Sequence, residues 1–454
     1  MVNFLEFHGK LDPRQHGSRS GRSTLSQLLQ HQDEILQALE NGENIDSIYL
    51  DFSKAYDKVD HGILLHKLRN LGISGKLGRW IMSFLTGRRQ EVLVRGHKSR
   101  SSILISGVPQ GSVLGPLLFL IFIGDISEGV SAVTLVYVDY SKVKDKISNE
   151  SDVEKLQTNL NKIYEWETNN NMKFNGGKFQ VVRYGRNQKL KEDTMYFTGG
   201  MEDVIEEVEN VSDLGVILTN DARFDAQVEK VCQKATQKSG WILRTFFSRN
   251  LSFMRHMFNS LVQPHVDYCS QLYAPNEGTQ MDKIENILRN FTKKIPAVKE
   301  MNYWQRLEKL KMNSEIRRLE RYKIIYTWKI LEERVPNCGL EENMTRTDQR
   351  GRMVKIPKMN TKAPKAVQTL REGSFQVSGP SLFNKLPRKI RDMKGCSVDD
   401  FKEKLDQFLS TIPDEPRCPG LTPSAVTPGG LPTNSLLYTI RTGGRGELEG
   451  WRVS

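Results

Sequence analysis

Two aspartates at the ends of apolar runs are the residues best suited to chemistry in this sequence. Asp51 closes the run in "IDSIYLDF", and Asp139 follows "VTLVYV" where the chain turns polar. If the two strands are neighbours in an antiparallel sheet, both carboxylates meet at one edge. Hard oxygen ligands of this kind suit magnesium, which completes its shell with substrate phosphates. Paired ions held by carboxylates catalyse phosphoryl transfer.

One alternative and one further feature bear on this interpretation. Taken alone, residues 133–144 also fit an ordinary hairpin, because Asp is a common turn residue. Between the two aspartates lies a Gly/Pro loop, "SGVPQGS". Gly111 in this loop would let the backbone approach a nucleotide closely, since no side chain intervenes.

Hydrophobic periodicity predicts the elements that must position these residues. It indicates helices over residues 25–40 and 54–73, a buried strand over 45–52, a hairpin over 90–105 and an apolar helix after the Gly/Pro loop. Ser151 and Glu154 have the spacing of a capping box at the start of a further helix. From about residue 205 the pattern is mostly helical, and residues 281–295 place their apolar side chains on one face.

Composition and charge restrict the class of protein. A chain of 454 residues is long enough for two or three domains. The formal net charge is +12, and residues 344–394 hold thirteen Lys and Arg against three Asp and Glu, a local +10. Such a stretch is typical of contact with phosphate backbones or an anionic membrane. A merely solvated basic surface is the alternative.

The cysteines and the apolar runs bear on the compartment. The five cysteines are widely spaced and form no Cys-x-x-Cys pair, which argues against a disulfide framework and a zinc site. The N-terminus lacks the apolar core of a signal peptide, and the longest apolar run, residues 113–123, is too short to span a bilayer. We therefore expect an intracellular protein of the cytoplasm or nucleus, neither secreted nor membrane-bound.

Several motifs, in order along the chain, carry a resemblance to a known family. They are "QHGSRSGRST" (15–24), "IYLDFSKAYDKVDH" (48–61), "SGVPQGSVLGPLLFLIFI" (106–123), "YVDYSK" (137–142), "MKFNGGK" (172–178), "DLGVILTND", "LVQPHVDYCSQLYAP" and "GPSLFNKLPRKIR". Together they resemble the reverse transcriptases of non-LTR (LINE-type) retrotransposons, in particular the jockey-like and chicken-repeat-like group. The resemblance extends to about residue 410. RNA-virus polymerases and group II intron maturases share the palm arrangement, but the "GPSLFNKLP" segment favours the LINE-type group.

The resemblance implies a fold and domain order. It predicts an α+β right-hand polymerase palm, an antiparallel sheet with helices that lacks most of the fingers, followed by a helical thumb and a basic, mostly helical C-terminal region. The expected domains are a palm with a fingers remnant (1–190), a thumb-like region (205–300), a basic helical region (301–412) and a disordered tail (413–454).

The resemblance also implies roles at the catalytic centre. Asp51 and Asp139 would bind two Mg²⁺ ions, and the carbonyl of Phe52 would be a further ligand. Tyr56 would clash with a ribose 2′-hydroxyl and so select deoxynucleotides. Lys178 would protonate the leaving pyrophosphate, a sensible position for a general acid.

Further positions would contact the substrates. Gln110 and Gly111 would hold the incoming nucleotide and the template. Arg19 and Arg22 would lie near the template strand. The implied partners are therefore an RNA template, a DNA primer and deoxynucleoside triphosphates, whereas the sequence gives no oligomeric state.

Three departures from the family pattern weaken the expected activity. The family has two adjacent aspartates where this chain has Asp139 and Tyr140, and a neutral phenol cannot replace a carboxylate as a magnesium ligand. Ser18 stands where phenylalanine is usual. The chain begins just before the "QHG" motif, so we expect a truncated reading frame without the upstream finger strands and endonuclease.

The sequence thus predicts an RNA-directed DNA polymerase domain with impaired activity. Two alternatives stay open: a catalytically dead remnant that only binds nucleic acid, and an unfolded product whose apolar palm surface is exposed.

Overall fold

The chain folds into two compact units, each described here by itself. The computed structural model describes residues 1–185, 193–199, 203–275, 277–342, 351–415 and 435–437. Unit 1 comprises Met1–Gln27 and Gly42–Leu214, and unit 2 comprises Leu28–Asn41 and Gly215–Ser454. The division falls inside helix α2 (Thr24–Glu40), so one helix contributes residues to both units.

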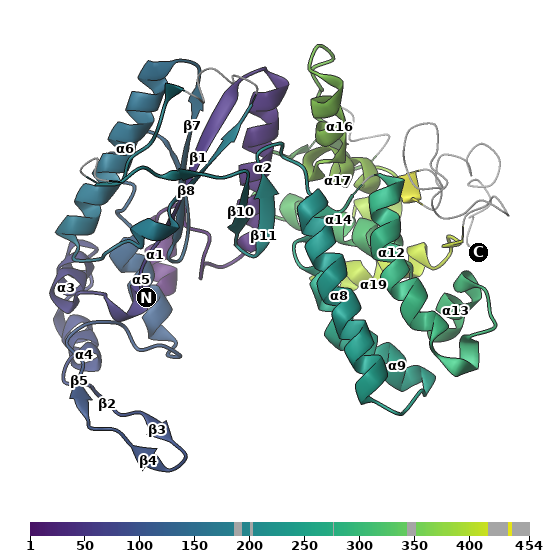
Figure 1. The fold of residues 1–454 in the computed structure, drawn as a ribbon, viewed down its shortest axis with the longest axis horizontal. Helices are drawn as coiled ribbons and strands as arrows, with labels where there is room; N and C mark the ends of the chain where they lie inside the picture. The colour runs from purple at the N-terminus through teal and green to yellow at the C-terminus, as the bar shows by residue number, and fades with distance from the viewer. Residues whose placement is uncertain (186–192, 200–202, 276, 343–350, 416–434, 438–454) are drawn as a thin grey trace. The chain divides into compact units, whose positions relative to one another are not determined.

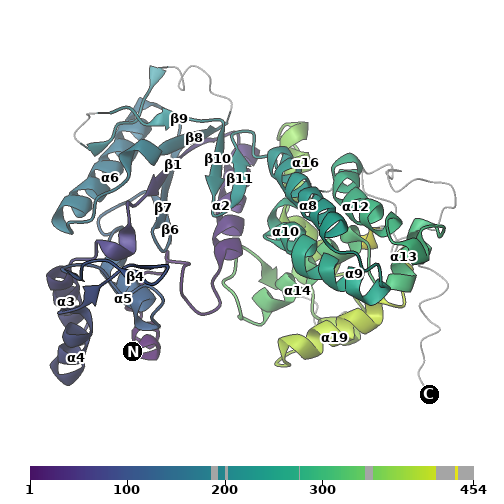
Figure 2. The same ribbon diagram turned by 60° about the horizontal axis from the view of Figure 1, so that its bottom comes forward.

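A five-stranded sheet is the framework of unit 1, in the order β6-β7-β1-β8-β9; Figure 1 labels β7, β1 and β8, and Figure 2 labels all five strands. The strands are β1 (Asn44–Asp51), β6 (Val133–Tyr137), β7 (Tyr140–Ile147), β8 (Gln180–Tyr184) and β9 (Glu206–Glu207). Strand β1 pairs antiparallel with both β7 and β8, and β8 pairs parallel with β9. The expected α+β class is therefore confirmed. The strands that lead to Asp51 and Asp139, β1 and β6, are not neighbours as expected, because β7 lies between them and pairs antiparallel with both.

Helices cover the sheet, and short ribbons extend from it. The helices of unit 1 are α1 (Val2–Phe7), the start of α2, η1 (Ala55–Asp57), α3 (His61–Asn70), α4 (Gly75–Leu85), α5 (Leu114–Ile123), α6 (Glu150–Asn169) and η2 (Gly176–Lys178). The ribbon strands are β2 (Arg89–Gln90), β3 (Leu93–Val94), β4 (His97–Lys98) and β5 (Ser102–Ile103), and β10 (Asn210–Asp213) follows β9. The predicted hairpin over 90–105 is confirmed, because β2 pairs with β5 and β3 with β4.

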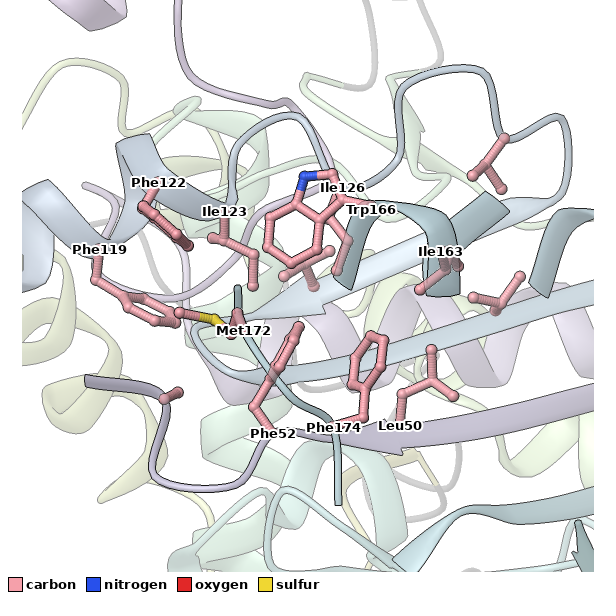
Figure 3. Close-up of a cluster of buried hydrophobic side chains, with 14 of the residues drawn as sticks. Leu50, Phe52, Phe119, Phe122, Ile123, Ile126, Ile163, Trp166, Met172 and Phe174 are labelled. Carbon is pink, nitrogen blue, oxygen red and sulfur yellow. The ribbon is translucent and has the colours of Figure 1, made fainter. Parts of the chain in front are cut away.

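The core of unit 1 lies between β1 and helices α5 and α6. Figure 3 shows Phe52 and Phe174 beside each other under Trp166. The rings of Phe52 and Phe174 stack with centroids 4.3 Å apart, and Phe52 meets Trp166 edge-on at 6.0 Å. Phe119 and Phe122 of α5, both 0% exposed, complete the cluster. This packing fixes the end of β1, the strand that carries Asp51.

The predicted capping box at Ser151 is wrong by two residues. Helix α6 begins at Glu150, and its N-cap is Asn149, whose side chain accepts a hydrogen bond from the Asp152 amide at 3.2 Å. Asp152 reciprocates by accepting from the Ser148 amide at 3.0 Å. Asn caps a helix as well as Ser does, and Asp152 supplies the return bond that the sequence pattern assigned to Glu154.

Unit 2 is mainly helical (Figure 2). Its helices are the remainder of α2, α8 (Asp225–Thr245), α9 (Leu251–Met257), η4 (Phe258–Val262), α10 (Gln263–Asp267), α11 (Ser270–Tyr273), α12 (Gly278–Lys293), η5 (Pro296–Val298), α13 (Tyr303–Leu310), α14 (Glu315–Leu331), α16 (Lys365–Gly373), α17 (Phe375–Phe383), α18 (Arg388–Arg391) and α19 (Val398–Leu409). Its short strands are β11 (Val216–Thr219), β12 (Glu341–Glu342) and β13 (Val354–Lys355). In α14, Trp328 is fully buried and stacks on Phe401 of α19 at 4.4 Å. The predicted apolar face of α12 is confirmed, since Met281, Ile284 and Leu288 are buried.

The basic stretch of residues 344–394 is only partly available at the surface. Arg352 and Arg371 are each 4% exposed and pair with Glu332 and Asp33. The expected disordered tail lies for the most part outside the described residues. Within the part of the chain that the structure describes, no helix is both long and apolar enough to cross a membrane.

Two buried carboxyls in unit 2 should make its stability depend on pH. Glu285 accepts hydrogen bonds from the amides of Glu315 and Ile316 at 3.0 and 3.3 Å, at the first turn of α14. Burial raises the pKa of Glu285 to about 7 and that of Glu315 to about 8. Between the unfolded and folded pKa values, the unfolded chain releases protons that the folded chain retains. Stability is therefore fully present at low pH and is lost as pH rises through these values.

We accordingly expect the thermal unfolding midpoint, followed by circular dichroism, to fall between pH 5 and pH 8. Glu285→Gln should reduce that fall, because the amide carbonyl still accepts both hydrogen bonds and cannot ionise. Glu308→Gln, at an exposed glutamate of α13, is the matched control. An unchanged pH dependence in Glu285→Gln would contradict the assignment.

Candidate active site

The β6–β7 hairpin presents Asp139 at its two-residue turn. Tyr137 pairs with Tyr140 across the hairpin, so Val138 and Asp139 form the turn itself. On the other side of β7, Asp51 at the end of β1 lies directly opposite Tyr140. The residue that faces Asp51 in the sheet is therefore the tyrosine, and Asp139 reaches the same edge from the turn.

The two carboxylates interact electrostatically. Burial raises the pKa of Asp139, and the negative charge of Asp51 raises it further. Burial and the charges of Asp51 and Asp139 also raise the pKa of the Tyr140 phenol. Tyr140 is 47% exposed and stays neutral at physiological pH. The edge thus holds two acidic groups and one phenol that cannot supply a third charge.

Lys178 lies against Asp51 because the segment after α6 is bonded to the end of β1. The Asn175 amide donates to the Asp51 carbonyl at 2.8 Å, and Phe52 forms a β-bridge with Phe174. Helix η2 follows at once and carries Lys178, whose Nζ lies 2.7 Å from Asp51 Oδ2. This hydrogen bond raises the pKa of the Lys178 ammonium. The sequence-predicted residues Asp51, Asp139 and Lys178 therefore come together.

A cavity of about 300 Å³ lies beside these residues. Asp51, Tyr140 and Lys178 line it, together with the buried ion pair of Lys142 and Asp213. Two carboxylates at one edge fit a single hard cation that completes its shell with phosphate oxygens. Among the described residues, no group of three or more His, Cys, Asp or Glu side chains is placed to hold a metal ion, and the neutral phenol of Tyr140 adds no carboxylate ligand.

The Gly/Pro loop is fixed to the segment that follows β1. The Val108 amide donates to the Tyr56 carbonyl at 2.8 Å, and Gln110 Nε2 donates to Asp57 Oδ1 at 2.9 Å. At Gly107, with φ +86°, a Cβ would lie 2.8 Å from the Asp57 carbonyl oxygen, so only glycine fits. The loop is therefore held against Tyr56 and Asp57, shortly after Asp51 in the sequence.

Tyr56 faces the same region. It lies in η1, five residues after Asp51, and its ring stacks on Phe119 with centroids 4.7 Å apart and planes 10° from parallel. Burial raises the pKa of Tyr56, and the charge of Asp139 contributes. Tyr56 is thus close enough to Asp139 to sense its charge.

The family model described as "Reverse transcriptase (RNA-dependent DNA polymerase)" matches residues 1–218, which contain all of these residues. The first 218 residues are thus similar to a reverse transcriptase domain. The RNA-directed DNA polymerase from mobile element jockey of Drosophila funebris is 27% identical over 293 residues, covering 62% of this chain and 31% of that protein. The probable RNA-directed DNA polymerase from transposon BS of Drosophila melanogaster is 38% identical over 116 residues, covering 26% and 13%.

The relatives bear out the resemblance to non-LTR retrotransposon polymerases. The chain spans about a third of the length of the jockey relatives, 31% and 30%. Among solved structures, apo telomerase from Candida tropicalis matches with a TM-score of 0.39 and 11% identity, covering 73% of this chain and 52% of that chain.

Two predicted template residues of the reverse transcriptase domain have internal partners. Arg19 donates from Nε to Glu6 Oε1 at 3.0 Å and from Nη1 to the Asp12 carbonyl at 2.6 Å. Arg22 Nη1 donates to the Pro13 carbonyl at 2.5 Å. These bonds attach the "SRSGR" segment to the preceding turn. Template contact by either arginine stays a prediction.

The other predicted substrate residues are placed as follows. The Phe52 side chain is 4% exposed and belongs to the core, which leaves its carbonyl as the group predicted to bind metal. Gly111 has φ +78° with open space where a Cβ would stand. Contact of Phe52, Tyr56, Gln110 or Gly111 with a nucleotide remains a prediction.

Asp57 accepts a hydrogen bond from Gln110 and so orients it, a role that was not predicted from the sequence. Residues 54–73 were expected to form one helix, and this was wrong at its start. Asp60 caps α3 by accepting from the Ile63 amide at 3.0 Å, so the helix begins only at His61. The sequence did contain a signal for the later helix start. Asp60 directly precedes His61, and Asp is a strong N-cap residue.

Proposed function

We propose that this chain carries the palm of an RNA-directed DNA polymerase that joins deoxynucleotides to a DNA primer on an RNA template. The observation that carries the proposal is that Asp51 pairs with Tyr140, the residue directly after the Val138–Asp139 turn, while Lys178 contacts Asp51. Those three groups are what nucleotidyl transfer needs: two acids for a hard cation and one acid for the leaving group. Residues 205–300 would form the thumb-like region of the proposal, and residues 301–412 its basic helical region.

Each residue has a role in the proposed reaction. Asp51, Asp139 and the Phe52 carbonyl would hold Mg²⁺, which when bound neutralises the phosphates and favours ionisation of the primer hydroxyl. The primer hydroxyl gives its proton to water, its oxygen attacks the α-phosphorus, and the bond from that phosphorus to the bridging oxygen of pyrophosphate breaks. Lys178 donates a proton to that pyrophosphate. Tyr56 would restrict the sugar to a deoxyribose, and Gln110 and Gly111 would hold the nucleotide and template.

Tyr140 limits this activity. The phenol stands opposite Asp51 where a third acid would complete the site for a second ion. We therefore propose that the chain retains a metal-binding and nucleotide-binding edge but catalyses transfer weakly.

Primer extension tests the function. A chain that carries Tyr140→Asp, joined to the finger segment of a jockey relative, should add deoxynucleotides to a DNA primer annealed to RNA when Mg²⁺ is present. Asp51→Asn in the same protein should abolish extension, whereas Asp203→Asn, an exposed aspartate of the same unit, should not. Equal extension with and without Asp51→Asn would overturn the proposal.

We expect the basic stretch to bind the RNA template and the DNA primer through their phosphate groups. Lys358, Lys362 and Lys365 are exposed in the basic stretch. Affinity for an RNA–DNA hybrid should fall with added salt, because each neutralised phosphate releases counterions. A triple Lys→Gln change at these positions should reduce the log–log salt slope by about 1 to 3, at up to roughly 0.9 per phosphate contact.

The salt series has a control of equal charge. Lys309, Lys311 and Lys404 are also exposed in unit 2 but lie outside the basic stretch. Their triple Lys→Gln variant should keep the original slope in fluorescence anisotropy titrations. Equal slopes for both triple variants would show that residues 344–394 do not form the phosphate contact.

A further inference from the structure

The N-terminal "RQHG" segment lies beside the hairpin that carries Asp139. The His16 amide donates to the Val136 carbonyl at 2.8 Å, and the Val136 amide donates to the Arg14 carbonyl at 3.1 Å. Gln15 and Val136 form a parallel β-bridge. The segment thus adds a short backbone pairing to β6, next to the turn.

Gln15 places its side-chain carbonyl on that turn. The side chain is buried, with 4% of the residue exposed. Gln15 Oε1 accepts hydrogen bonds from the Gly17 amide at 2.7 Å and the Val138 amide at 2.9 Å. Because both partners are N–H donors, the accepting atom must be the carbonyl oxygen of the amide. One side chain therefore fixes the first residue of the turn, 123 positions away in the sequence.

The turn needs an external bond because its conformation is unfavourable. Val138 has φ +58°, in the left-handed region. A β-branched residue rarely adopts that region, and such strain persists only where surrounding contacts fix it. Val138 also packs partly buried against the core of unit 1, which does not by itself satisfy its amide.

Gly17 is the second part of the arrangement. A Cβ at position 17 would lie 2.4 Å from Val138 Cγ2 and 2.7 Å from the Val138 nitrogen. Any larger residue would displace the turn or the Gln15 carbonyl. The close approach thus explains glycine after the Gln-His pair.

We propose that Gln15 is a positioning residue, which holds the Val138–Asp139 turn so that Asp139 meets Asp51, and that Gly17 provides the space for this contact. The proposal rests on the proposed function only in taking Asp139 as a metal ligand. It gives the "QHGSRSGRST" motif a role at the catalytic centre through Gln15 and Gly17. The arginines of the motif, Arg19 and Arg22, instead bond to residues of the preceding segment.

Amide hydrogen exchange tests the contact without reference to metal or activity. In Gln15→Met, which keeps length and burial but loses the acceptor, the Val138 amide should exchange about tenfold faster or more, because its bond opens locally. Gln27→Met is the matched control: Gln27 is 1% exposed in the same unit, and its side-chain amide bonds to no described residue. Unchanged Val138 exchange in Gln15→Met would overturn the proposal.

Terbium binding tests the consequence for the acids. Terbium is a hard cation whose luminescence nearby tyrosines sensitise, and Asp51→Asn and Asp139→Asn should each abolish the signal. Gln15→Met should weaken terbium binding about tenfold, as the loss of an outer residue that orients a ligand does. Gln27→Met should leave it unchanged.

A rescue variant separates positioning from general destabilisation. Glycine adopts positive φ without strain, so Val138→Gly should let the turn form without Gln15. Terbium affinity of Gln15→Met with Val138→Gly should therefore return to that of Val138→Gly alone. A folded double variant that still binds weakly would overturn positioning. If the original chain binds no terbium while the exchange result holds, the metal site of the proposed function fails and the role of Gln15 in the turn is supported.

Discussion

Replacing Tyr140 by aspartate is expected to raise RNA-templated DNA synthesis about a thousandfold in a chain joined to a relative's finger segment. The reason is the missing charge opposite Asp51. An additional carboxylate that completes a metal site should lower the barrier by about 4 kcal/mol, and each 1.4 kcal/mol is about tenfold in rate. Single-turnover primer extension with matched protein amounts measures the difference.

The same series separates charge from size. Tyr140→Phe keeps the ring and removes only the hydroxyl, so it should stay as slow as the tyrosine chain. Asp139→Asn should abolish whatever activity returns. Fast extension by the unmodified chain would show that Asp51 and Asp139 suffice.

Replacing Lys178 by methionine in the restored protein should lower the turnover rate by about a hundredfold to a thousandfold, the usual worth of a positioned general acid. The KM for the deoxynucleotide should change much less, because the proton is needed only as pyrophosphate leaves. A lysine ammonium keeps its proton at neutral pH. Activity that depends on this proton should fall only at alkaline pH, and Lys178→Met should remove that alkaline fall.

Two further variants decide between proton donation and simple charge. Lys178→Arg keeps a cation beside Asp51 but gives up its proton far less readily, so it should remain nearly as slow as methionine. Lys173→Met alters an exposed lysine of the same segment and should have no effect. Full activity in Lys178→Arg would assign Lys178 an electrostatic role instead.

The sequence predicts elements well where local pattern and packing agree. The strand ending at Asp51 and the apolar face of α12 follow from periodicity, because each buries the residues that the pattern marks as apolar. The start of α6 was misplaced because two overlapping capping patterns, at Asn149 and Ser151, are equally acceptable locally. Only the surrounding fold selects one of them.

The site was predictable in its residues and less so in its geometry. The ends of the apolar runs pointed to Asp51 and Asp139, and the resemblance to the family pointed to Lys178; the structure places the three together. That Val138 would adopt positive φ runs against the preference of a β-branched residue, and the bond from Gln15 that accompanies it spans 123 positions. No local rule predicts such a contact.

The division of the chain within helix α2 has a consequence for the order of synthesis. All of α2 after Gln27 belongs to unit 2, where Asp33 pairs with Arg371, 338 residues later. At about 5–20 residues per second, a ribosome needs roughly 17–68 s to reach that partner. During this interval Leu29, Ile35 and Leu36, each no more than 1% exposed in the finished fold, lack the residues of unit 2 that are translated later. The nascent chain therefore carries an apolar helix face that is a natural binding site for chaperones until translation is nearly complete.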